Sequence, residues 1–79
     1  MSFALYPLNA GPDASPVKQV SNAIWREITH KATDVPTWSP GRAAVHYSEY
    51  QLRRLAVANP SHADWLLQLA DQHNGAVLR

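Results

Sequence analysis

The chain has 79 residues, the size of one small domain. It has no cysteine, which excludes disulfide frameworks, thiol nucleophiles and thiolate metal sites. Its net charge is +1 and only 16% of its residues are charged, and its basic residues are dispersed, unlike the concentrated basic stripe of a nucleic-acid binder.

The first segment, residues 2–8, alternates weakly between apolar and polar side chains, which predicts an extended N-terminal arm laid on the helices. Pro7 argues against a central strand. The segment lacks the basic start and long apolar run of a signal peptide, and the chain has no apolar run of membrane-spanning length. We therefore expect a cytoplasmic protein.

Residues from about 16 to 31 predict the first helix. Ser15 is a suitable N-cap and Pro16 suits the first helical position. The apolar positions with helical spacing are Val17, Val20, Ile24 and Ile28. Trp25 adjoins this apolar line, so it belongs either to the core or to a contact surface.

Residues 33–41 form a connector rich in proline and glycine, and we expect Trp38 in its middle to plug the core rather than stand out. After it, residues 43–47 place apolar side chains at alternate positions. A short two-stranded ribbon between residues 3–6 and 43–47 is an alternative that would make the fold α+β.

Residues 49–58 predict a second helix with a well-marked start. Ser48 is suited to the N-cap, and Gln51 stands three residues later, as in a capping box. Leu52 and Leu55 share one helical face, while Arg53 lies on another part of the helix. The next proline, at position 60, ends the helix.

Residues 61–74 predict the third helix. Asn59 with Pro60, or Ser61 with Asp64, is suited to cap its start. The pair Asn74 and Gly75 is typical of a left-handed C-cap. Together the three segments predict an all-α fold, a small three-helix bundle of one domain spanning residues 1–79.

No constellation in the sequence indicates catalysis, a cofactor or a metal. The four histidines are His30, His46, His62 and His73. None has a histidine partner at the i, i+4 spacing of helix-borne zinc ligands. The serines are explained as helix caps, and no nucleophile elbow, phosphate loop or dinucleotide fingerprint occurs. We therefore expect a protein that is not an enzyme and holds no cofactor.

Protein binding is the remaining class of function, and aromatic and arginine side chains of the kind that dominate binding energy at interfaces support it. The candidate partner-binding residues are Trp25, Tyr50, Arg53, Arg54 and Trp65. We expect a small regulator or inhibitor that occupies the surface of a larger protein or complex, of the kind that bacteriophages and mobile elements encode. The alternative is a DNA-binding regulator, because residues 49–58 and 61–74 have the arrangement of a helix-turn-helix.

Overall fold

The computed structural model describes residues 2–9, 11, 13–36 and 44–79. The elements in chain order are β1 (Ser2–Pro7), β2 (Lys18–Ser21), α1 (Asn22–His30), β3 (Val45–Ser48), α2 (Glu49–Ala58), the 3-10 turn Pro60–His62, α3 (Ala63–His73) and β4 (Gly75–Leu78). Trp38, which the sequence suggested as a plug for the core, lies outside the described residues.

The expected all-α bundle is wrong, because the fold is α+β. Within the described residues, four strands form an antiparallel sheet in the order β2-β1-β4-β3, and three helices accompany it. The expected N-terminal arm is β1, a central strand that pairs with β2 on one side and β4 on the other. Pro7 does not prevent this pairing, because it is the last residue of the strand, where the ladder ends.

The predicted helix over residues 16–31 begins six residues too early. Residues Lys18–Ser21 form β2, in which Val20 pairs with Phe3 of β1. Ser21, rather than Ser15, caps the helix, and its Oγ accepts a hydrogen bond of 3.2 Å from the amide of Ile24. The spacing of the apolar residues satisfied a helix as well as a strand that continues into a helix, so pairing with β1 decided between them.

The alternative ribbon identified two strands but paired them wrongly. β1 and β3 both exist, yet β4 lies between them and pairs with each. Leu78 of β4 is opposite Leu5 on one side and Val45 on the other. The C-terminal segment therefore joins the two strands into one sheet.

The two C-terminal helices are close to the prediction. Helix 49–58 is confirmed as α2, and its capping box is complete, with Ser48 N to Gln51 Oε1 at 2.9 Å and Gln51 N to Ser48 Oγ at 3.1 Å. The segment predicted as helix 61–74 is instead the 3-10 turn followed by α3. Asn74 ends α3 in the left-handed conformation, with φ 57°, as its sequence predicted.

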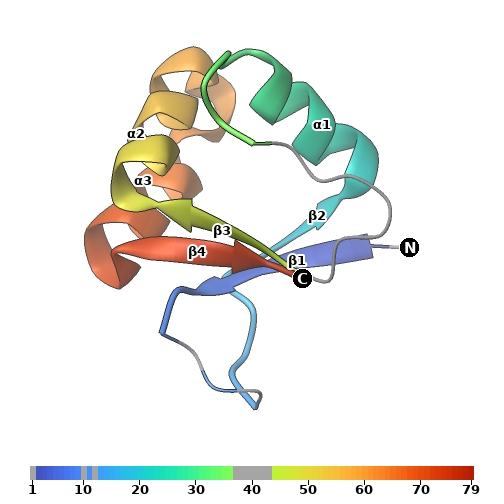
Figure 1. The fold of residues 1–79 in the computed structure, drawn as a ribbon, viewed down its shortest axis with the longest axis vertical. Helices are drawn as coiled ribbons and strands as arrows, with labels where there is room; N and C mark the ends of the chain where they lie inside the picture. The colour runs from blue at the N-terminus through green and yellow to red at the C-terminus, as the bar shows by residue number, and fades with distance from the viewer. Residues whose placement is uncertain (1, 10, 12, 37–43) are drawn as a thin grey trace.

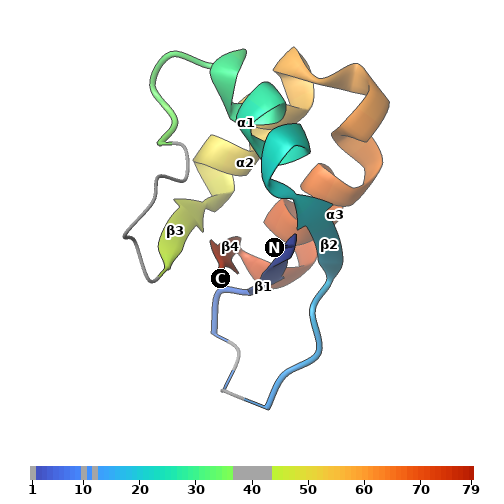
Figure 2. The same cartoon turned by 90° about the vertical axis from the view of Figure 1, so that its right-hand side faces the viewer.

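All three helices lie on the same side of the sheet (Figures 1 and 2). Because helices cover only one side of the sheet, burial alternates along β3. Val45 and Tyr47 are buried, while His46 and Ser48 are exposed. On the other side of the sheet the Arg79 guanidinium lies 4.1 Å from the centre of the Tyr6 ring. The core is therefore a single layer between helices and sheet.

Asn59, which follows α2, joins two helices inside this core. It is 2% exposed, and its Nδ2 donates to the carbonyl oxygens of Ile28, at 3.0 Å, and Leu55, at 2.9 Å. Its side chain makes no cap bond to the 3-10 turn, and the N-cap of α3 is His62, also without a side-chain cap bond. Of the two caps expected for the third helix, Asn59 with Pro60 occupies the expected positions but begins the 3-10 turn rather than α3, and His62 rather than Ser61 is the N-cap of α3. Asn59 instead fixes the end of α2 against α1.

Candidate functional site

The five candidate partner-binding residues do not form one surface. Trp25 is buried and Trp65 is half-buried, whereas Tyr50, Arg53 and Arg54 are exposed together on α2. The structure therefore separates the two tryptophans from the exposed part of the candidate site.

Trp25 is a core residue, with 1% of its surface exposed. Its Nε1 donates a 3.0 Å hydrogen bond to Tyr47 Oη, and the two rings meet edge to face with centroids 5.2 Å apart. Tyr47 Oη in turn donates to the carbonyl of Pro36 at 2.8 Å. This chain of bonds connects α1, β3 and the segment after α1, so Trp25 stabilises the fold and is not available to a partner.

Trp65 packs at the edge of the core, where its ring centroid lies 6.3 Å from that of Trp25. Its Nε1 donates to His62 Nδ1 at 3.3 Å, and Lys18 Nζ lies 5.5 Å from the ring centre. The polar part of the ring is thus already satisfied within the chain. Trp65 presents only a part of its surface to solvent.

One face of α2 consists of the exposed Tyr50, Arg53, Arg54 and Val57 and the half-buried Ala58, and is called the α2 stripe. Its members recur at the three-and-four spacing that places side chains on one helical face. The core face of the same helix is Leu52, Leu55 and Ala56. The residues of the α2 stripe and those of the core face alternate along the helix. Burial of the core face therefore leaves the α2 stripe facing solvent.

Val57 is a member of the stripe that the sequence reasoning missed. It is 83% exposed, and Tyr50 is 63% exposed, which makes them the two most exposed large hydrophobic residues among those described. Val57 lies seven residues after Tyr50 and therefore on the same helical face. This spacing could have identified Val57 as a member of the stripe from the sequence. Two apolar side chains on one exposed helical face are a larger patch than either would be alone.

The α2 stripe borders a depression of about 460 Å³. The opposite wall comes from the turn that follows α1, and the lining residues are Lys31, Ala32, Thr33, Tyr50, Arg53, Arg54, Val57 and Ala58. The lining includes three cationic side chains and no carboxylate. The contact between this turn and α2 is tertiary, so the sequence offered no signal for it.

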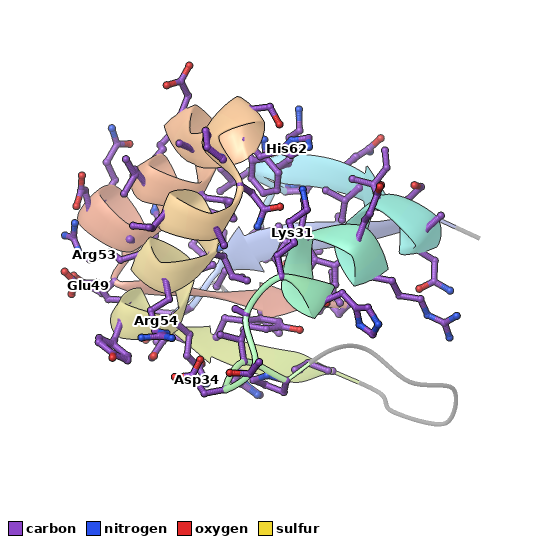
Figure 3. All side chains as sticks on the ribbon, turned by 90° about the horizontal axis from the view of Figure 1, so that it is seen from above. Lys31, Asp34, Glu49, Arg53, Arg54 and His62 are labelled. Carbon is purple, nitrogen blue, oxygen red and sulfur yellow. The ribbon has the colours of Figure 1, made fainter. Side chains whose placement is uncertain are left out.

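The two arginines of the stripe are held by carboxylates around them (Figure 3). Arg53 pairs with Glu49, at 2.8 Å, and with Asp71 of α3. Arg54 Nε lies 3.0 Å from Asp34 Oδ1, and its guanidinium carbon is 5.8 Å from the centre of the Tyr50 ring. These ion pairs are exposed and contribute little to stability, but they orient both guanidinium groups.

The surroundings of both guanidinium groups raise their pKa above the ordinary arginine value. For Arg53 the main cause is its hydrogen bond to Glu49. For Arg54 the causes are its hydrogen bond to Tyr50 and then the charge of Asp34. Both side chains therefore keep their positive charge at every pH at which the protein is handled.

The chemistry of the described residues provides no metal centre, since no three histidine, aspartate or glutamate side chains in that part of the chain converge to hold an ion. No helix in the described ranges is both long and apolar enough to cross a membrane. A scan against protein-family models and searches of curated proteins and of solved structures found no match to this chain.

Proposed function

We propose that this chain is a small non-enzymatic protein-binding module, which regulates or inhibits a larger protein assembly in the cytoplasm by occupying part of its surface. The observation that carries the proposal is the α2 stripe. It combines an exposed tyrosine, an exposed valine and two oriented arginines beside a depression. Tyrosine and arginine are the residue types most enriched at binding hot spots, along with tryptophan.

The size of the chain supports a mechanism of surface occupation. A standard protein interface covers about 800 Å² of each partner. This is about one sixth of the 4739 Å² of accessible surface on this chain. A partner on the α2 stripe would therefore cover most of one side of the molecule. A bound module of this kind acts by steric exclusion and needs no reactive group.

DNA binding receives less support from the arrangement of charges. In a helix-turn-helix reading, α3 is the recognition helix, and its exposed side carries Asp64, Gln68, Asp71 and Gln72. The two carboxylates oppose approach to phosphates. The positive charge of Arg53, on the neighbouring helix α2, is already paired with Asp71 of α3.

The test is affinity capture from a lysate of the cells that encode the chain, with the full chain as bait and the lysate treated with nuclease. Three versions of the protein are used as bait. The wild type and a control variant, Leu67→Ser on the exposed side of α3, are expected to retain the same stoichiometric protein partner. The variant Tyr50→Ala/Val57→Ser is expected to lose it while keeping its circular dichroism spectrum. Retention of the partner by this variant would refute the α2 stripe as the binding surface, and loss of all captured material on nuclease treatment would favour the DNA alternative.

A further inference from the structure

We infer that the occupant of the α2 stripe is a short segment of a partner protein in which carboxylate side chains flank an apolar side chain. This inference rests on the proposed function and adds the chemistry of the partner. Three features of the depression carry it, namely the sign of its charges, its unused hydrogen-bond donors and the apolar side chains beside them.

The charge of the lining is of one sign. Lys31, Arg53 and Arg54 line the depression, and none of its lining residues is acidic. Lys31 makes no ion pair within the described part of the chain. The carboxylates that pair with the arginines stand outside the lining. A segment that enters the depression therefore contacts cationic side chains of its lining and no acidic ones. This charge favours carboxylates on the segment.

The arginines also retain donors that nothing in the described residues uses. Arg53 donates through Nε and Nη2, so its Nη1 has no partner there. Arg54 donates through Nε and Nη1, so its Nη2 has none. The existing ion pairs thus fix the two guanidinium groups and leave donors for an incoming acceptor. Hydrogen bonds from such oriented groups to carboxylates are stronger than neutral ones and cost less ordering.

Apolar side chains share the depression with these cations. Val57 lies three residues beyond Arg54 on the same face, and Ala58 follows it. Tyr50 adds its exposed ring at the other end of the stripe. From position 50 to position 58 the helix rises about 12 Å, which matches two turns of a helix or about four residues of extended chain. A segment of this length can place one apolar side chain against Tyr50 or Val57 and carboxylates against the cations beside them.

A second copy of this chain is a poorer occupant of the same surface. Two-fold pairing of the stripe with itself would bring the cations of one depression against those of the other, since an isologous interface uses the same patch twice. Like charges that face each other across an interface are unfavourable. The charge of the lining therefore favours a different chain with acidic side chains.

The experiment is a titration of the isotopically labelled full chain, followed by NMR, with three capped eight-residue peptides. Each peptide has the same single leucine near its centre, flanked by glutamates in the first peptide, glutamines in the second and lysines in the third. The glutamate peptide is expected to shift the amides of α2 and of residues 31–33, and to bind at least about fivefold more tightly than the glutamine peptide. The difference is expected to shrink as salt is raised.

Matched variants test whether the named cations are responsible. Arg54→Gln and Lys31→Gln are each expected to reduce the preference for the glutamate peptide over the glutamine peptide. Arg26→Gln removes the same charge from an exposed position of α1 and is expected to preserve this preference. Equal binding of all three peptides at α2 would overturn the acidic chemistry and leave the proposed docking surface standing. The absence of shifts at α2 with every peptide would overturn the inference, and the proposed function would still be decided separately by the capture experiment with Tyr50→Ala/Val57→Ser.

Discussion

Replacing Asn59 by aspartate tests how the helices are fixed to each other. The two side chains have nearly the same shape, so the change removes the Nδ2 donor without leaving a cavity. In the native chain this donor serves the carbonyls of Ile28 and Leu55, at 3.0 and 2.9 Å. In Asn59→Asp an oxygen faces both carbonyls inside a site that is 2% exposed.

The expected loss of stability follows from these contacts. Two hydrogen bonds are lost, each worth about 1 kcal/mol net, and a buried carboxylate left without a donor adds a penalty of about 1–3 kcal/mol. The total is about 3–5 kcal/mol at pH 7. A chain of 79 residues has a free energy of unfolding of about 4–12 kcal/mol, so Asn59→Asp removes a large share of it.

The assay is denaturant unfolding followed by circular dichroism, with Asn9→Asp on the exposed turn after β1 as the matched control. Burial without a donor raises the pKa of the carboxyl introduced at position 59 in the folded state above the unfolded value of about 3.9. As the pH falls, the folded state then binds protons before the unfolded state does. The loss of unfolding free energy in Asn59→Asp is therefore full at neutral pH and becomes smaller as the pH falls toward 4. A loss below about 1 kcal/mol at pH 7, or a deficit that does not depend on pH, would refute this account of Asn59.

Three further changes test the fold. Gly75→Ala is expected to cost about 3 kcal/mol in the same unfolding assay, because its Cβ would lie 2.6 Å from the Tyr47 carbonyl at a φ of +142°; a loss below about 1 kcal/mol would contradict this close approach. Trp25→Phe is expected to cost about 2–3 kcal/mol through the lost bond to Tyr47 Oη and the lost volume, and an unchanged unfolding midpoint would contradict its place in the core. Ser48→Ala is expected to cost about 1 kcal/mol by opening the capping box, with no change in near-ultraviolet circular dichroism.

The sequence was informative where local chemistry decides the structure. Ser48 and Gln51 satisfy the amides at the start of α2, and Asn74 with Gly75 ends α3, and both features depend only on neighbours in the chain. The exposure of Arg53 and Arg54 followed from the same helical periodicity that buries Leu52. These elements were predicted nearly as the structure has them.

The sheet was missed because its evidence is not local. β2 and β4 have four residues each, too few for a strand period to be told from a helix by pattern alone. Each is specified by its partner, as when Leu78 lies between Leu5 and Val45. The wall of the candidate site at residues 31–33 was missed for the same reason, since it meets α2 only in the folded chain.

The most direct test of the proposed function is site-specific photo-crosslinking in the cells that naturally encode the chain. A photoreactive amino acid is placed at position 57, where the native side chain is 83% exposed, and in a matched experiment at position 68 on the exposed side of α3. The proposal predicts one cross-linked protein partner from position 57 and none from position 68. Cross-linking from position 68 alone, or equally from both positions, would contradict the assignment of binding to the α2 stripe.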